Sequence, residues 1–191
     1  MRFKNKELQF AYEKSVWYCK KYGNKSNGHT INHTHRVMLN ALWLQRKLKL
    51  QCNTKLLIIS TLLHDISRSY GYCGDIHGFM SYKLVEDFLM NQLQLSNEEL
   101  EIVKQAITKH CIDDKTVHQS IEEKVMYDAD KLDGFGLRGM YRIFVYHYIE
   151  RRNGVRFVLN KMNHGMNKRR NNLHFNISKK KSKFLNIHWR K

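Results

Sequence analysis

The sequence contains no proline among its 191 residues. Proline breaks helices by removing a backbone donor and clashing with the preceding turn, so its absence permits long helices without establishing any. The chain also lacks a run of about 18 apolar residues, because Ser60 and Thr61 interrupt its most apolar stretch, residues 56–63. The N-terminal residues contain no apolar secretory core. We therefore expect neither a membrane span nor a signal peptide.

Cysteine is scarce, and its spacing bears on the compartment. The four cysteines form no CxxC pair and lie far apart, at Cys19, Cys52, Cys73 and Cys111. Disulfides belong mainly to oxidising compartments, and paired or clustered cysteines would be typical of a disulfide framework or a zinc site. This pattern predicts reduced thiols in a cytoplasmic protein.

Acidic residues are absent from the C-terminal part of the chain. No Asp or Glu follows Glu150, whereas residues 161–191 contain 10 Lys and Arg, and the formal net charge of the whole chain is +17. Such a basic tail is suited to contact with nucleic acid or another polyanion. A solvated end of the chain would have the same composition.

Apolar residues recur at helical spacing along most of the chain, and no alternating strand pattern occurs. The apolar stripes of the predicted helices lie at residues 8–19, 33–48, 56–63, 79–89, 100–110 and 121–132. Ser96 and Glu99 form a capping-box signature, and residues 137–168 read as one or two helices broken near Asn153 and Gly154. We predict an all-α fold, with one compact multi-helix bundle at residues 1–170 followed by a basic tail at residues 171–191.

Ionisable residues occupy apolar faces of four predicted helices. His64 and Asp65 directly follow the most apolar run, and His33, His110 and Asp130 lie on or beside the stripes of other helices. An unpaired buried charge costs on the order of several kcal/mol. Each residue alone is commonly a hydrogen-bonded core residue or a helix cap. Together, imidazoles and carboxylates brought in by several helices suit a divalent cation inside a bundle.

Four sequence words occur in a fixed order around these residues. They are HTHRV at 33–37, LLHDISR at 62–68, IHGFMS at 76–81 and DADKLDGFG at 128–136. Over roughly residues 10–150 the chain resembles the HD-domain metal-dependent phosphohydrolase superfamily, and most closely the small bacterial HD hydrolases. The resemblance implies an HD-domain bundle that binds one divalent metal ion through His33, His64, Asp65 and Asp130. It also implies that Asp65 helps to orient the attacking water.

Three neighbouring residues compete for two of these places. His35 offers a second imidazole in HTH, but the family words and the stripe position favour His33. Asp128 and Asp133 offer alternative carboxylates, and the ADKLD word favours Asp130. The ligand set does not select the metal, since Mn, Mg, Co, Fe, Ni and Zn all accept imidazole and carboxylate ligands.

Cationic and histidine side chains suited to an anionic substrate lie close to these positions in the sequence. Arg36, Arg68 and Lys131 each follow a proposed ligand by one to three residues and are candidates for phosphate binding or for surface ion pairs. His77 and His110 are candidates for phosphate binding or for protonating the leaving group. The resemblance favours a catalytic role for these two histidines beside Asp65. Arg138 is a weaker candidate than these.

The sequence thus predicts a phosphohydrolase in which metal-activated water attacks a phosphate ester or anhydride, of a nucleotide or a related small molecule. Two alternatives use the basic tail. One is a nucleic-acid-binding protein with a structural or regulatory HD core, and the other is a nucleic-acid phosphodiesterase. Deleting residues 171–191 is predicted to leave hydrolysis of a small substrate nearly intact. The alternative is that the apolar residues between 173 and 189 fold back on the domain as a lid or dimer contact.

Overall fold

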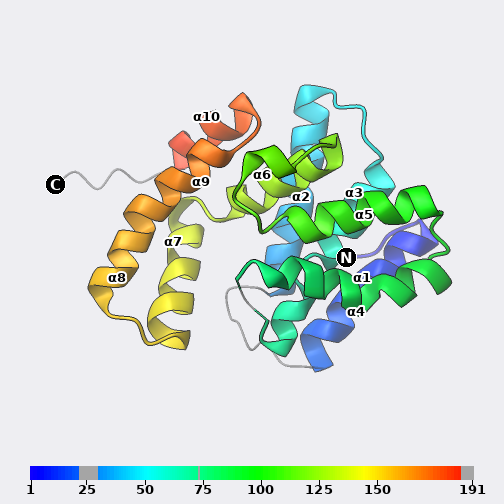
Figure 1. Cartoon of the computed structure of the whole chain (residues 1–191), viewed down its shortest axis with the longest axis horizontal. Coiled ribbons are helices and arrows are strands. Elements are labelled where there is room, and N and C mark those ends of the chain that lie inside the picture. The colour runs from blue at the N-terminus through cyan, green and yellow to red at the C-terminus, as the bar shows by residue number, and fades with distance from the viewer. Residues whose placement is uncertain (22–29, 73, 186–191) are drawn as a thin grey trace.

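The computed structural model describes residues 1–21, 30–72 and 74–185, and these residues form helices and no strands (Figure 1). The predicted all-α fold is confirmed. In chain order the elements are α1 (Lys6–Lys21), α2 (Ile31–Leu48), α3 (Thr54–Leu63), η1 (Ile66–Tyr70), α4 (Ile76–Asn91), α5 (Asn97–Lys109), η2 (Lys115–Val117), α6 (Ile121–Asp133), α7 (Gly136–Phe144), η3 (Val145–Glu150), α8 (Val155–Asn160), η4 (Lys161–Gly165), α9 (Met166–Asn172) and α10 (Asn176–Leu185). The predicted end of the first helix, near Gly23, lies outside the described residues.

Side-chain caps fix the starts of three central helices. The Asn53 side chain accepts a hydrogen bond from the backbone N–H of Leu56 and begins α3. The Ser96 capping box at α5 is present as predicted. A second capping box, which the sequence analysis missed, begins α6 at Ser120 with Glu123 as its acidic partner. Each cap satisfies backbone donors that the first turn of a helix leaves without intrahelical partners.

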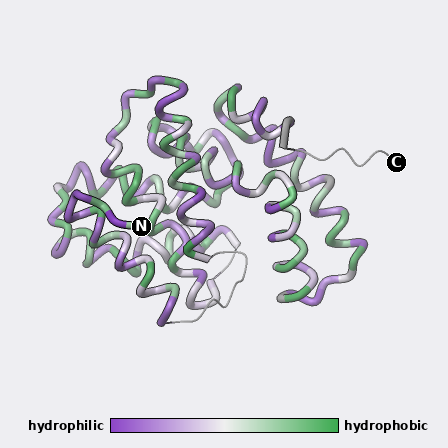
Figure 2. Tube along the Cα trace, turned by 180° about the vertical axis from the view of Figure 1, so that it is seen from behind, coloured by the Kyte–Doolittle hydropathy of each residue, from purple (hydrophilic) through white to green (hydrophobic). Residues whose placement is uncertain are grey.

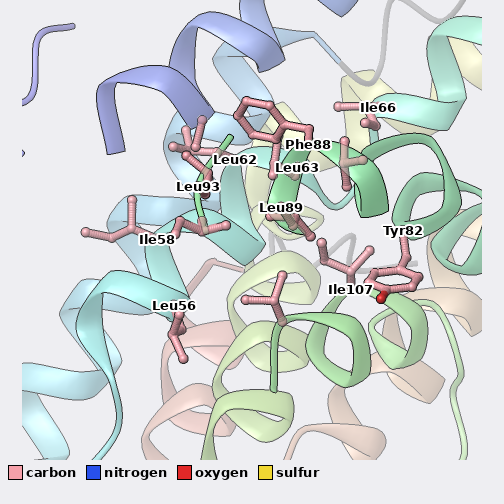
Figure 3. Packing of buried hydrophobic residues seen from close by; sticks show 14 of the residues in the cluster. Leu56, Ile58, Leu62, Leu63, Ile66, Tyr82, Phe88, Leu89, Leu93 and Ile107 are labelled. Carbon is pink, nitrogen blue, oxygen red and sulfur yellow. The ribbon is translucent and has the colours of Figure 1, made fainter. Parts of the chain in front are cut away.

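Helix α3 lies at the centre of the fold. All residues from Leu56 to Leu63 are buried, and the helix packs against α1, α2 and α5. On one side, apolar residues of α1, α3, α4 and α5 form the cluster shown in Figure 3. On the other side, a second cluster joins α2 and α6 to the C-terminal helices. Because α3 is covered on every face, the two residues that follow its last turn, His64 and Asp65, lie buried in the interior.

The C-terminal helices extend the bundle on one side. Helices α7 and α8 form a hairpin that projects from the body of the molecule, with hydrophobic and hydrophilic segments alternating along it (Figures 1 and 2). The predicted break near Asn153 and Gly154 separates η3 from α8. Within the segment expected to be a tail, Leu173 is fully buried and α10 packs on α6, α7 and α9.

Two further expectations concern cysteine and the membrane. Cys19, Cys52 and Cys111 are free thiols, as predicted, while Cys73 lies outside the described residues. Among the described helices, none combines the length and the apolar character that crossing a bilayer requires.

Candidate metal centre

His33 lies in the first turn of α2 and is fully buried. Its Nε2 atom lies 3.3 Å from Oδ1 of Asp130 and 3.4 Å from Oδ2 of Asp65. The Nε2 atom of His64 is 3.3 Å away. The adjacent packing of α2, α3 and α6 therefore brings together the four side chains that the sequence analysis selected as ligands.

His64 presents a free lone pair to this point. Its Nδ1 lies 2.8 Å from the carbonyl oxygen of Thr61, which can only accept, so Nδ1 carries the proton in the neutral ring. Nε2 is then unprotonated and faces Oδ2 of Asp65 at 3.4 Å and Oδ1 of Asp130 at 4.0 Å. Because His64 follows Thr61 by three residues at the end of α3, its contact with the Thr61 carbonyl fixes both the orientation of the ring and its tautomer.

The distances between the four donor atoms are compatible with one metal ion bound to all of them. They lie 3.3 to 4.0 Å apart for every pair whose distance is given above. Ligands about 2.0–2.2 Å from one metal are roughly 3–3.6 Å apart at bond angles near 90–110° and about 4.2 Å apart when opposite. Two imidazole nitrogens and two carboxylate oxygens at these separations fit a divalent cation.

The electrostatics of the centre also favour a positive charge. Burial and the charge of Arg142 lower the pKa of His33, but its contacts with Asp130, Asp133 and Asp65 raise it more, to about 9. Burial raises the pKa of Asp130, yet the charge of Lys131 and the contact with His33 bring it well below its ordinary value. The Asp130 carboxylate is therefore ionised, and a proton or a metal ion at Nε2 of His33 compensates the negative charge around it.

The three aspartates of α6 have different neighbours. Asp130 faces His33 and His64, as described above. Asp133 contacts the other ring nitrogen, Nδ1 of His33, at 2.7 Å. Asp128 accepts hydrogen bonds from the backbone N–H groups of His174 and Phe175, and burial raises its pKa to about 6. The structure thus brings only Asp130, among the three competing carboxylates, to the donor atoms of both histidines.

His35, the competing imidazole of HTH, lies in a different environment. Its ring stacks on Tyr12 of α1, with ring centroids 5.5 Å apart and an interplanar angle of 25°. Helix α2 therefore directs His33 toward α3 and α6 and His35 toward α1.

The second oxygen of Asp65 faces another pair of histidines. Oδ1 lies 3.2 Å from Nε2 of His77 and 3.5 Å from Nε2 of His110, and the two rings approach to 2.9 Å. Both Nδ1 atoms contact backbone carbonyls, of Gly74 and Ile107, so neutral rings would direct two lone pairs at each other. The pair therefore requires a further proton or cation, and Asp65 lies beside it. Burial lowers the pKa of His110 to about 4.

Alternative groupings of donor atoms occur around the same point. Three sets of potential ligands have mutually close donor atoms among the described residues: His33, His64 and Asp130; His64, Asp65 and His110; and His77, His110 and Cys111. Asp65 thus belongs to both groups, with one oxygen toward His33 and His64 and the other toward His77 and His110.

A cavity of about 390 Å³ opens onto this centre. Asp65, Arg68, His77, Asp130 and Lys131, all selected from the sequence, contribute to its lining. Arg68 contacts Oδ1 of Asp65 at 3.5 Å and Nε2 of His77 at 3.2 Å. Lys131 donates to the carbonyl oxygen of His110 and lies 3.4 Å from Oδ2 of Asp130.

The far wall of this cavity contains residues that the sequence analysis missed. They come from α7, η3, η4 and α9 and include Arg142, Tyr146, His147, Lys161 and Arg169. A signal was present, since the basic residues lie within or beside apolar helical stripes. Their approach to the centre depends on how the C-terminal helices pack, which spacing does not reveal.

Arg36 and Arg138 lie elsewhere. Both line a second cavity of about 430 Å³, between α2 and the start of α7. Arg36 donates from Nε to Oδ1 of Asp133 at 2.5 Å and from a terminal nitrogen to Oδ2 at 2.9 Å. Its guanidinium is thus occupied by Asp133, and its role in substrate binding stays a prediction.

Comparison with known proteins places this geometry in context. The HD domain family matches residues 30–134, more than half of the chain. An uncharacterized protein from Clostridium beijerinckii is 30% identical over 122 residues, which cover 63% of this chain and 69% of that relative.

Two solved structures share the fold. An HD-superfamily hydrolase from Bacillus thuringiensis has 25% identity and a TM-score of 0.66, covering 93% of this chain and 90% of that protein. YpgQ from Bacillus subtilis, solved in complex with ADP, has 19% identity and a TM-score of 0.66, covering 95% of this chain and 89% of that protein.

Proposed function

The chain belongs to the HD domain family, and we propose that it is a metal-dependent phosphohydrolase acting on a phosphate ester or anhydride of a nucleotide or related small molecule. The observation that carries this proposal is the convergence of His33, His64, Asp65 and Asp130 beside a cavity that the two carboxylates line together with basic side chains. Bacterial neighbours of similar size and fold include an HD-superfamily hydrolase.

We propose one resident divalent cation, held by Nε2 of both histidines and one oxygen of each carboxylate. When bound, such an ion lowers the pKa of a coordinated water and polarises a phosphoryl oxygen. Oδ2 of Asp65 faces His33 and His64, and Oδ1 faces His77. One carboxylate can therefore bind the ion through Oδ2 and orient the attacking water through Oδ1. Mn, Mg, Co, Fe, Ni and Zn all remain compatible with this donor set.

The remaining catalytic work falls to the His77–His110 pair. The Nε2 atoms of these two rings lie 2.9 Å apart beside Asp65, so a proton held between them can pass to the leaving oxygen as the phosphorus–oxygen bond breaks. The apolar residues of α3 that precede His64 and Asp65 exclude water and strengthen local electrostatics.

Cationic side chains in the cavity suit the phosphate groups of the substrate. Arg68 and Lys131 contact the proposed ligands Asp65 and Asp130, and Lys161 and Arg169 line the same cavity. Phosphate oxygens accept charge-assisted hydrogen bonds from such groups. The neighbour YpgQ was solved with ADP, which supports a nucleotide as the ligand here.

A release assay tests this function. Phosphate and pyrophosphate are measured over a panel of nucleoside mono-, di- and triphosphates, with each divalent metal added and with a chelator. We expect metal-dependent release that Asp65→Ala abolishes while the circular dichroism spectrum stays helical. Asp87→Ala, which removes an exposed carboxylate of α4, serves as the matched control and should retain activity. Release by Asp65→Ala at the wild-type rate would refute the mechanism.

A second candidate is a phosphodiesterase or binding protein that acts on nucleic acid. It is favoured by the exposed residues Arg151, Arg152 and Arg156 on the α7–α8 hairpin, in a region with no acidic residue after Glu150. Nucleic-acid binding through these groups should weaken steeply with salt because counterions are released. Lys181 contributes less, since it contacts Asn40 and the ring of Trp43.

A further inference from the structure

The buried carboxylate of Asp133 lies next to the proposed ligand His33 rather than at the metal position. Its Oδ2 atom is 2.7 Å from Nδ1 of His33, and the side chains are 5% and 0% exposed. An ionised carboxylate can only accept, so Nδ1 of His33 must be the protonated nitrogen. Nε2 is then the nitrogen at which a metal ion can take the place of a proton, and it is the atom that faces Asp65 and Asp130.

Two arginines from different helices hold Asp133 in place. Arg36, one turn along α2 from His33, donates to both carboxylate oxygens. Arg142 of α7 donates from Nη1 to Oδ2 at 2.6 Å. The two guanidinium groups compensate the negative charge of the buried carboxylate with charge-assisted hydrogen bonds.

Close packing of α7 against the end of α6 places Arg142 next to Asp133. A Cβ atom on Gly139 would lie within 2.0 Å of the carbonyl oxygen of Gly134, so only glycine permits this approach. Arg142 follows Gly139 by three residues, on the adjacent turn of α7. The helix lies beyond residues 30–134, the part of the chain that the HD domain family matches.

We propose that Asp133 is a positioning residue that fixes the orientation and tautomer of His33 for metal binding, and that Arg142 couples the C-terminal helices to the metal centre by holding Asp133. This inference rests on the proposed function, because it assumes that His33 is a metal ligand. Carboxylates that orient a ligating histidine contribute about 10- to 100-fold to metal affinity in comparable sites.

The test measures Mn²⁺ affinity by isothermal titration calorimetry on the full chain. We expect Asp133→Asn to weaken Mn²⁺ binding about 10- to 100-fold. Arg142→Ala should weaken it by a smaller factor, and Arg142→Lys, which retains the positive charge, should recover part of that loss. Asp128→Asn is the matched control, because this buried α6 carboxylate accepts from His174 and Phe175 and contacts neither His33 nor Arg142 in any described interaction.

A purely structural role gives a different result. Asp133→Asn and Arg142→Ala would then lower the melting temperature and leave Mn²⁺ affinity at the wild-type value, and this outcome would overturn the proposal. If Asp133→Asn does not fold, the two Arg142 variants decide, and equal affinities for Arg142→Ala and the wild type would overturn the coupling. Absence of Mn²⁺ binding by the wild type would also overturn the proposal. Mn²⁺ binding without hydrolysis would refute the proposed function alone, since affinity is measured without substrate.

Discussion

Replacing Gly78 by alanine should separate two helices that meet at the candidate site. Gly78 follows His77 on α4, and a Cβ atom there would lie 2.7 Å from the backbone carbonyl oxygens of both Ile107 and Thr108. Ordinary contacts of this kind begin near 3.4 Å, so α4 and α5 must move apart by about 0.7 Å. The obstacle is backbone on both sides, which cannot be relieved by a change of rotamer.

The expected cost of this substitution has a thermodynamic and a catalytic part. Overpacking of this kind destabilises proteins by about 1–3 kcal/mol, which for a chain of this size corresponds to roughly 2–12 °C in melting temperature. The same movement carries His77 away from His110, and the Nε2 atoms of these two residues are now 2.9 Å apart. Since misplacement of catalytic groups by about 1 Å can reduce rates on the order of 100-fold, we expect at least a 10-fold lower rate of phosphate release.

Differential scanning fluorimetry and the release assay measure the two parts. Gly165→Ala is the matched control, because no neighbouring atom lies within 4 Å of its added Cβ and its backbone is helical, with φ −63°. That variant should be as stable as the wild type or more stable by about 0.4–1 kcal/mol. A Gly78→Ala protein that melts within about 1 °C of the wild type and keeps its rate would refute the packing argument.

Two further predictions concern stability. Burial raises the pKa of Glu123, but hydrogen bonds from Gln119, Lys109 and Ser120 lower it more, and the folded pKa lies below the ordinary value. The ionised Glu123 side chain therefore stabilises the folded protein above the unfolded pKa of about 4.3. This contribution is lost as pH falls through the lower folded pKa. Glu123→Gln should therefore destabilise by about 1–2 kcal/mol at pH 7, and urea titrations should show the difference shrinking below about pH 4; a constant difference would contradict this. Truncation after residue 170 removes Leu173, whose burial alone is worth about 2–5 kcal/mol, so thermal unfolding should shift down by several degrees, whereas an unchanged midpoint would support a domain limit at residue 170.

The residues of the candidate centre could be selected from the sequence because they interrupt apolar stripes. His33, His64 and Asp130 lie where helical spacing expects core residues, and burial of that kind requires a partner. Spacing alone did not separate Asp130 from Asp133, which lie within one turn of α6. Both contact His33, but through different ring nitrogens, and only tertiary structure distinguishes them.

Other parts of the fold depended on long-range packing. Arg142 reaches Asp133 because α7 packs closely on the end of α6, and no local pattern in the sequence specifies that approach. Arg36 was expected near phosphate from its position one turn after His33, whereas the structure pairs it with Asp133. The capping box at Ser120 is different, since its signature was present in the sequence and was overlooked.

The most direct test of the central claim is the position of a metal ion in crystals of the full chain grown with Mn²⁺. Anomalous scattering distinguishes manganese from the lighter atoms of the protein and from water. We expect one peak about 2.0–2.3 Å from Nε2 of His33, Nε2 of His64, Oδ2 of Asp65 and Oδ1 of Asp130. A peak found only at His77, His110 and Cys111, or no peak at the four-residue centre, would contradict the account.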